Sequence, residues 1–393
     1  MTGATYRLTL SLTVILLVGL AWPADAEQPI RIGASIGLTG AFAKPGAYAQ
    51  QGYQLCQKRV NEQGGVLGRK NDFIFYDDRS DPQTAVRLYE KLITEDKVDT
   101  VMGPYASNIT EAVANVTEKY QKLMVAPLAA TTSIWEKGRK HLIMIVSPSE
   151  AYLEGLIDLA AGHGLKTLAL INEDTLFPKA SVKGAVELAK KKGMEVLFQE
   201  AYPKGTTDFA AILTKVKAAK PDVLAAATYF DDVVAITRQM KELDVNVKMF
   251  GSTVGGDLPE YYNLLGKTAE YVYGASQWEP GLPHPGNTEF VDAFEKEFNR
   301  RPSYHSAAAY AGCQLLAEAA RSVGSLDPEK LRTYLLNLRT RTMFGDYQVD
   351  ERGFQIGHKM VTIQWQDGKQ VLVWPSDLAT AKPRYPTPPW RQR

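Results

Sequence analysis

Small, hydroxyl-bearing and aromatic residues follow an apolar segment of the sequence, where a strand would end and a helix begin. The run GPYAS at 103–107 separates the apolar residues 100–102 from a pattern typical of an amphipathic helix that starts near Asn108. Small residues let backbone N–H groups approach a ligand, and the N-terminus of a helix favours an anion. Ser107 and Thr131, each close to the end of an apolar segment, would together suit a carboxylate.

Similar runs recur at other segment ends. In an open α/β sheet, ligands bind beyond the carboxyl ends of the strands. Any one of these runs is also explained by ordinary loops and helix caps, which use the same residue types. Their recurrence favours a binding site. The runs are GLTGAFAKPG (37–46), GPYASN (103–108), APLAATTS (126–133) and TYFDD (228–232).

Motifs of catalysis and cofactor binding are missing from the sequence. It contains no phosphate-binding loop of the GxxxxGK[ST] type, no GxSxG turn and no HExxH pair. The acids Asp77, Asp78 and Asp81 could hold a metal, but a strand end and a helix cap also explain them. We therefore expect a binding protein without metal or cofactor. A secreted hydrolase or oxidoreductase remains an alternative that only measured turnover would support.

The first 26 residues have the pattern of a secretory signal peptide. Arg7 supplies the positive charge, 8–22 is mostly apolar, and Ala24-Asp25-Ala26 fits a cleavage site before Glu27. A membrane anchor is the alternative, but the apolar stretch is short for a bilayer. We therefore expect an exported, soluble mature protein.

Charge and cysteine content exclude other classes. The 45 basic and 44 acidic residues give a net charge of +1, without the basic excess typical of nucleic-acid binding. Cys56 and Cys313 could pair, but they are far apart in sequence and each lies in an apolar helical pattern. Free cysteines are typically buried in such places, so we expect two unpaired thiols.

Apolar strand-like segments alternate with helical patterns along most of the chain, which predicts an α/β protein with parallel sheets. The length of 393 residues indicates two domains. Near the C-terminus, Asp367-Gly368 predicts a hairpin, and the proline-rich 382–390 predicts an extended arm laid over a surface. The main strand candidates are 32–38, 73–76, 98–102, 123–128, 142–146, 168–172, 196–201, 223–229, 248–252 and 271–275.

Taken together, these segments resemble the periplasmic amino-acid-binding proteins of the leucine/isoleucine/valine type, the receptors of ABC importers. Each motif is weak alone, but the set covers nearly the whole mature chain. The motifs are IRIGASIGLTGAFAKPGAYAQQGYQL (30–55), VNEQGGVLGRK (60–70), YDDRSDPQTAV (76–86), VMGPYASNIT (101–110), APLAATT (126–132) and DFAAILTKVKAAKPDVL (208–224).

The resemblance implies two Rossmann-like lobes that close on a ligand by a hinge of three crossovers, near 146–149, 276–278 and 360–363. It implies a periplasmic monomer that delivers its ligand to an ABC permease in the inner membrane. A ligand-sensing partner of a membrane receptor would use the same fold. The expected boundaries are 1–26 for the signal peptide, 27–147 with 277–361 for lobe 1, and 148–276 with 362–393 for lobe 2.

Ligand contacts carry over residue by residue. Ser107 and the stretch 129–131 match the positions that hold the ligand carboxylate, and Phe177 and Tyr229 match aromatic walls of lobe 2. Pro45 stands where an aromatic side wall can occur. The expected binding residues are Tyr105, Ser107, Ala129, Ala130, Thr131, Phe177, Tyr229, Thr253 and His305.

One departure affects the identity of the ligand. The family pairs the ligand ammonium with an acidic residue, and the matched position here is Thr253, beside Val254. A buried ammonium without an anion carries a large desolvation cost. The sequence therefore favours a small hydrophobic or aromatic carboxylate. A branched-chain or other neutral amino acid is the alternative, with Asp257 or Asp231 as the substitute acid.

Overall fold

The computed structural model describes residues 1–5 and 28–393. The predicted signal peptide therefore lies almost entirely outside the described residues. Within the described part of the chain, no helix is long and apolar enough to cross a membrane.

A five-stranded sheet forms the core of lobe 1, with the order β2-β1-β3-β4-β5 and parallel pairing throughout. Its strands come from the apolar runs that the sequence predicts, because a parallel sheet covered on both faces favours continuous apolar segments. The strands are β1 (Ile30–Ile36), β2 (Asn71–Asp77), β3 (Thr100–Met102), β4 (Met124–Ala126) and β5 (Leu142–Met144).

A seven-stranded sheet forms the core of lobe 2, with the order β14-β13-β10-β9-β8-β6-β7. The pairs β10–β13 and β13–β14 are antiparallel and the other pairs are parallel, and the predicted turn at Asp367-Gly368 joins β13 and β14 as a hairpin. The strands are β6 (Thr167–Glu173), β7 (Glu195–Tyr202), β8 (Val223–Ala227), β9 (Met249–Ser252), β10 (Tyr273–Ser276), β13 (Val361–Gln366) and β14 (Lys369–Trp374), and a separate pair in lobe 1 is β11 (Thr340–Arg341) with β12 (Asp346–Tyr347).

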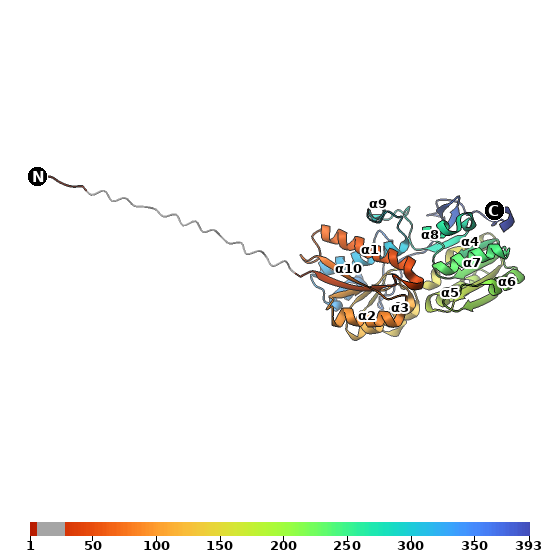
Figure 1. Cartoon of the computed structure of the whole chain (residues 1–393), viewed down its shortest axis with the longest axis horizontal. Helices are drawn as coiled ribbons and strands as arrows, with labels where there is room; N and C mark the ends of the chain where they lie inside the picture. The colour runs from red at the N-terminus through yellow and green to blue at the C-terminus, as the bar shows by residue number, and fades with distance from the viewer. Residues whose placement is uncertain (6–27) are drawn as a thin grey trace.

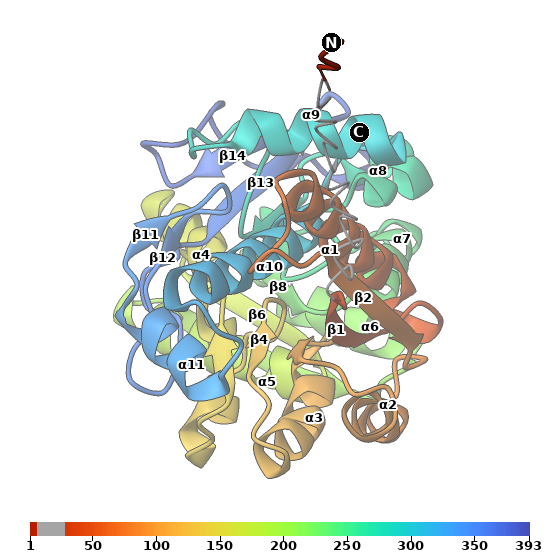
Figure 2. The ribbon, with the colours of Figure 1, turned by 90° about the vertical axis from the view of Figure 1, so that its left-hand side faces the viewer.

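Helices cover both faces of each sheet, which gives two three-layered α/β lobes side by side (Figure 1). In lobe 1, α1 and α10 lie together on one face and α2 and α3 on the other (Figure 2). The helices of lobe 1 are α1 (Ala43–Glu62), α2 (Pro82–Thr94), α3 (Ser107–Lys119), α9 (Asn287–Phe298), α10 (Tyr304–Val323) and α11 (Pro328–Asn337). Those of lobe 2 are α4 (Glu154–Gly162), α5 (Leu176–Lys191), α6 (Ala210–Ala219), α7 (Phe230–Glu242) and α8 (Pro259–Leu265).

The chain passes between the two sheets three times: between β5 and β6, after β10, and before β13. Hydrogen bonds join the three passages to one another. The Ser147 hydroxyl donates to the backbone oxygen of His358 over 3.0 Å. The His358 Nε2–H donates to the backbone oxygen of Gln277 over 2.9 Å. The three segments therefore form one hinge.

Aspartate side chains hold the starts of two helices. Asp81 accepts a hydrogen bond from the Thr84 backbone N–H over 2.7 Å, as expected of a helix cap, and Pro82 is the first residue of α2. The N-cap of α6 is Phe209, and the Asp208 carboxylate before it accepts a hydrogen bond from the backbone N–H of Ala210 over 2.9 Å.

The proline-rich C-terminal arm lies extended on lobe 2, as predicted. The Thr387 backbone N–H donates to the Lys248 oxygen over 3.0 Å, at the start of β9. The Trp390 indole N–H donates to the Val245 oxygen over 2.7 Å. The arm therefore covers the loop between α7 and β9.

The expectation of two unpaired thiols is wrong. Cys56 of α1 and Cys313 of α10 form a disulfide across a sequence separation of 257 residues. Both side chains are buried, as expected, but α1 and α10 lie against each other on the same face of the sheet. Sequence separation gave no sign of this packing.

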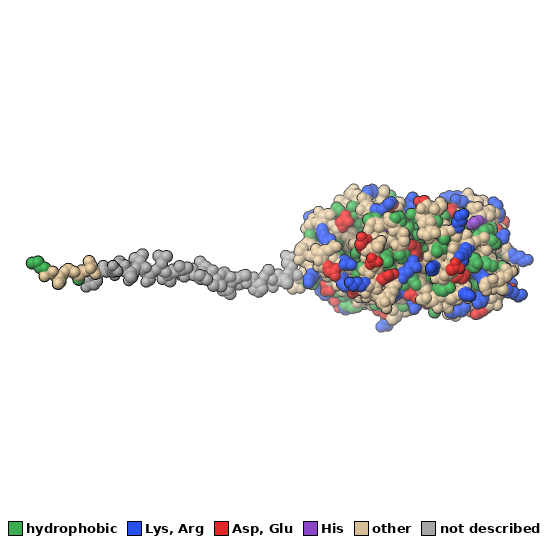
Figure 3. Space-filling model, turned by 90° about the horizontal axis from the view of Figure 1, so that it is seen from above, with side chains coloured by type: hydrophobic (Ala, Val, Ile, Leu, Met, Phe, Trp, Pro, Cys, Tyr) green, Lys and Arg blue, Asp and Glu red, His purple; other side chains and the backbone are tan. Residues whose placement is uncertain are grey.

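Charged side chains of both signs are interspersed over the face drawn in Figure 3. Ion pairs form at the protein surface, among them Lys58 with Glu297 and Lys215 with Glu200. This mixture agrees with the balanced composition of the sequence.

Candidate functional site

A small cavity lies between the lobes, where the carboxyl ends of the central strands of both sheets meet. Both sheets change strand order there, which is where α/β proteins bind ligands. Its volume is about 10 Å³, close to the minimum for one water molecule. No charged side chain is among the described residues of its wall. The wall consists of Tyr105, Ala106, Ser107, Leu128, Tyr152, Phe177, Tyr229, Val254 and Tyr304.

Aromatic rings of both lobes pack against one another around the cavity. The ring of Phe42 in lobe 1 lies 4.7 Å from that of Tyr229 in lobe 2 and 5.3 Å from that of Tyr105, between centroids. Phe177 lies 5.8 Å from Tyr229 and packs edge-on against Tyr152 at 4.8 Å. Such pairs add favourable contact energy beyond their buried area. An organic molecule can enter this space only if the lobes separate.

Ser107 is the first residue of α3, and its side chain lines the cavity. Ala106, directly before it, has a φ of 73°, which an alanine rarely adopts. The Ser107 oxygen accepts a hydrogen bond from the Ala130 backbone N–H over 3.1 Å. The hydroxyl hydrogen therefore remains available to donate, beside the positive end of the helix dipole.

The stretch 129–131 lies behind Ser107 and is not part of the cavity wall. Ala129 and Ala130 are buried, and Ala130 holds Ser107 through its N–H. The Thr131 hydroxyl lies 3.0 Å from that of Ser149 in the hinge. Thr131 also lines a second hollow of about 480 Å³ at the lobe boundary, together with residues of lobe 2 such as Lys179.

Thr253 and His305 also lie outside the cavity wall. The Thr253 hydroxyl donates to the Thr228 oxygen over 3.0 Å and accepts from the Thr228 N–H over 2.9 Å, so it joins the ends of β8 and β9. The His305 ring packs against Tyr105 and Tyr304, and burial lowers its pKa to about 3. His305 is therefore neutral at physiological pH.

Two carboxyl groups of lobe 2, Asp257 and Glu173, are buried but do not belong to the cavity wall. Burial is the largest cause that raises the pKa of Asp257 to about 8, and the charge of Glu279 raises it further. Burial also raises the pKa of Glu173, at the end of β6. These carboxyls hold a proton more strongly than free acids do. Asp231, by contrast, is exposed in the first turn of α7.

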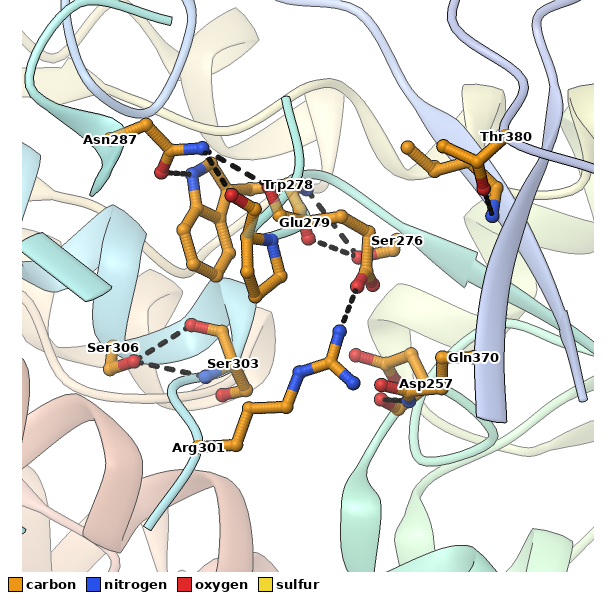
Figure 4. Close-up of polar contacts among 12 residues, drawn as sticks. Asp257, Ser276, Trp278, Glu279, Asn287, Arg301, Ser303, Ser306, Gln370 and Thr380 are labelled. Atoms are coloured by element: carbon orange, nitrogen blue, oxygen red, sulfur yellow. Dashed lines mark hydrogen bonds and ion pairs between the residues drawn. The ribbon is translucent and has the colours of Figure 1, made fainter. Parts of the chain in front are cut away.

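Glu279 and Arg301 form an ion pair next to this group, with the guanidinium 3.1 Å from the carboxylate (Figure 4). Figure 4 also shows that Arg301 points toward the part of the molecule that contains Asp257. The buried Glu279 therefore has its own cation, whereas the hydrogen bond recorded for the Asp257 carboxylate comes from the backbone N–H of Gly255.

Two cations cross from one lobe to the other at the rim of the cleft. Arg300 of lobe 1 pairs with Glu260 of α8, and its guanidinium stacks on Tyr48 at 3.6 Å. Lys204 of lobe 2 donates to the Ser80 backbone oxygen of lobe 1 over 3.1 Å. Both contacts exist only while the lobes are close together.

Sequence reasoning missed several residues of the wall and its surroundings. Phe42 lies in a loop that the sequence singles out, three residues before Pro45, so its aromatic character was a usable signal. Tyr152 follows the first crossover and belongs to no motif. Glu173 is the last residue of β6, one residue beyond the strand that the sequence predicts at 168–172.

The chain matches the model of the periplasmic binding protein family over residues 29–370, and it belongs to that family. A leucine-, isoleucine-, valine-, threonine- and alanine-binding protein of Pseudomonas aeruginosa is 24% identical, over 93% of this chain and 97% of the relative. A Leu/Ile/Val-binding protein homologue of Brucella melitensis is also 24% identical, over 96% of this chain and 98% of the relative.

Solved structures share the fold. A leucine-binding protein of Thermotoga maritima has a TM-score of 0.80 and 21% identity, over 87% of this chain and 97% of its own. A solute-binding protein of an ABC transporter from R. palustris, in complex with benzoate, has a TM-score of 0.79 and 18% identity, over 88% of this chain and 95% of its own. The fold class predicted from the sequence, two α/β lobes of the periplasmic-binding type, is confirmed.

The ion pair between Arg300 and Glu260 predicts a measurable effect on lobe closure. Glu260→Gln should weaken the closed arrangement by about 1 kcal/mol, because it removes one charge of a partly buried pair. Small-angle X-ray scattering of the solute-free protein should then show a larger radius of gyration.

The matched control is Glu297→Gln, which breaks the pair with Lys58 inside lobe 1. The control should scatter as the unmodified protein does. Equal radii of gyration for both variants and the unmodified protein would show that the Arg300–Glu260 pair does not hold the lobes together.

Proposed function

We propose that this protein is the periplasmic receptor of an ABC importer and binds a small hydrophobic or aromatic carboxylate between its two lobes. It is exported by the signal peptide at 1–26, acts as a monomer without enzymatic activity, and delivers its solute to a permease in the inner membrane. The lobes are 27–147 with 277–361 and 148–276 with 362–393, and they close on the solute by hinge motion.

The composition of the cavity wall carries the proposal. The wall is aromatic and uncharged, and it contains the Ser107 hydroxyl at the N-terminus of α3. A carboxylate needs hydrogen-bond donors and a positive potential, both of which this helix end supplies. An aromatic or aliphatic tail fits the rings of Tyr105, Phe177 and Tyr229.

The acid position of the amino-acid binders supports the same choice. We assign Thr253 to this position, and its hydroxyl both donates to and accepts from the Thr228 backbone. Asp231 is exposed and lies away from the wall. The benzoate complex of the R. palustris protein shows that this fold accommodates such a ligand.

A neutral amino acid is the second candidate, and Asp257 is the observation that favours it. This carboxyl is buried, and, after burial as the larger cause, its ionised form would raise the pKa of Tyr105, Tyr152 and Tyr304 of the wall. An ammonium group nearby would lower the pKa of Asp257 and stabilise its anion. The leucine-binding relatives are consistent with such a ligand.

Matched ligand pairs distinguish the two candidates. Isothermal titration calorimetry would compare benzoate, 3-phenylpropanoate and 4-methylpentanoate with L-phenylalanine and L-leucine, which add an ammonium group to the last two acids. We expect the acids to bind and the amino acids to bind at least tenfold more weakly, because an unpaired buried ammonium loses its hydration.

Asp257→Asn is the matched variant for this experiment. If the carboxylate proposal is correct, it leaves the affinity for the acids unchanged or raises it. Tight binding of the amino acids alone, lost in Asp257→Asn, would reject the carboxylate and assign the ammonium to Asp257.

Ser107 is predicted to contact the carboxylate of the solute. Ser107→Ala should weaken the binding of the tightest acid in that series by roughly 1–3 kcal/mol, the usual cost of a lost hydrogen bond to a charged group. Calorimetry measures the loss directly.

Ser35→Ala is a suitable control for the serine variant. Ser35 is buried in β1 of the same lobe, and its hydroxyl donates to Asp78 over 3.1 Å, away from the cavity. This control should lose stability and keep its affinity. An unchanged affinity in Ser107→Ala would remove Ser107 from the site.

A further inference from the structure

Gln277 occupies the second crossover, and the residues on both sides of it are fixed. Ser276 donates its hydroxyl to the Trp278 backbone oxygen over 2.8 Å. The Trp278 indole N–H donates to Asn287 over 2.8 Å (Figure 4). Gln277 itself is 1% exposed, so its side-chain amide must find its partners inside the protein.

The orientation of that amide follows from one neighbour. The Ser147 backbone N–H can only donate, and it lies 2.6 Å from one terminal atom of the Gln277 side chain. That atom must be the oxygen Oε1. The nitrogen Nε2 therefore faces the hydroxyl of Tyr152, at 2.6 Å.

This arrangement sets the polarity of the Tyr152 hydroxyl. Because Nε2 carries hydrogens and no free lone pair, it donates, and the Tyr152 oxygen accepts. The hydroxyl hydrogen of Tyr152 then remains for a partner on the cavity side. Tyr152 belongs to the cavity wall, so its hydroxyl can donate to an acceptor bound there.

We propose that Gln277 is a positioning residue that makes Tyr152 a hydrogen-bond donor toward an acceptor oxygen of the bound solute. The inference rests on the proposed function and deepens it, because it supplies a second donor beside Ser107. Ser107 comes from lobe 1 and Tyr152 from lobe 2. Two donors from opposite lobes select a solute whose polar end has two acceptor oxygens, and they meet it together only when the lobes close.

Edge packing keeps the tyrosine in place for this role. The Tyr152 ring lies 4.8 Å from the Phe177 ring, with the planes 80° apart. Tyr152 directly follows the first crossover, and its backbone N–H donates to the Ser149 oxygen. The Gln277 side chain therefore connects Tyr152 of the wall with Ser147 of the hinge.

A double-mutant cycle with benzoate as the probe tests the proposal. Gln277→Met keeps the length of the side chain and removes all hydrogen bonds of its amide, and Tyr152→Phe removes only the hydroxyl. Each single variant should weaken benzoate binding about tenfold, as expected for one hydrogen bond to a charged group. The double variant should bind no more weakly than either single variant.

Gln355→Met provides the matched control. Gln355 is equally buried in the hinge, and its Nε2 donates to the Ile145 oxygen over 3.0 Å without touching the cavity wall. Gln355→Met should lower the free energy of unfolding and leave benzoate affinity unchanged. Additive losses in the double variant, or an equal loss of affinity in Gln355→Met, would overturn the proposal.

A spectroscopic readout in the absence of benzoate separates this inference from the proposed function. The ultraviolet resonance Raman difference between the unmodified protein and Tyr152→Phe isolates the tyrosine bands of Tyr152, which report whether its oxygen accepts a hydrogen bond. We expect the Tyr152 bands of the unmodified protein to show an accepting hydroxyl. This feature should disappear in Gln277→Met and remain in Gln355→Met. An unchanged signature in Gln277→Met would reject the role of Gln277, whether or not benzoate binds.

Discussion

Closing two lobes over a cavity of about 10 Å³ leaves no room for bulk water, so each polar group of the wall must find a partner in the protein or in a bound solute. This constraint explains the arrangement around the cavity. Ser107 accepts from Ala130, and Tyr152 accepts from Gln277. Both hydroxyls are thereby left as donors. Residues outside the wall thus decide what kind of solute the wall can satisfy.

The same constraint governs the charges. Burial raises the pKa of Asp257 to about 8, so this carboxyl adds little negative potential against an anion at neutral pH. The fixed cations that join the lobes lie at the rim, where Arg300 and Lys204 cross between them. The interior therefore depends on hydroxyls, backbone dipoles and aromatic surface, and the rim contributes to closure.

Much of the fold and part of the site could be predicted from the sequence. Continuous apolar segments fix the strands, residues at strand ends gave Ser107, Tyr105 and Tyr229, and the family resemblance gave Phe177; all four line the cavity. Thr253 shows the limit of this reasoning. Its place at the end of β9 is predictable, but its hydroxyl points to the Thr228 backbone, and a sequence does not show side-chain direction.

Contacts between distant segments were the other gap. Tyr152 follows a crossover and joins no periodic pattern, so nothing local connects it with Gln277, 125 residues away. The pairing of Cys56 with Cys313 was missed for the same reason, since it depends on how α1 packs against α10. Residues that act through tertiary contacts leave little trace in local sequence, whereas residues at strand ends leave a clear one.

A crystal structure of the protein with benzoate bound tests the central claim most directly. The account predicts closed lobes, with one carboxylate oxygen within hydrogen-bond distance of the Ser107 hydroxyl and the other on the side of Tyr152 and Tyr304. The benzoate ring would lie among Tyr105, Phe177 and Tyr229. A carboxylate turned away from the N-terminus of α3, or benzoate bound outside the cleft between the lobes, would contradict the account.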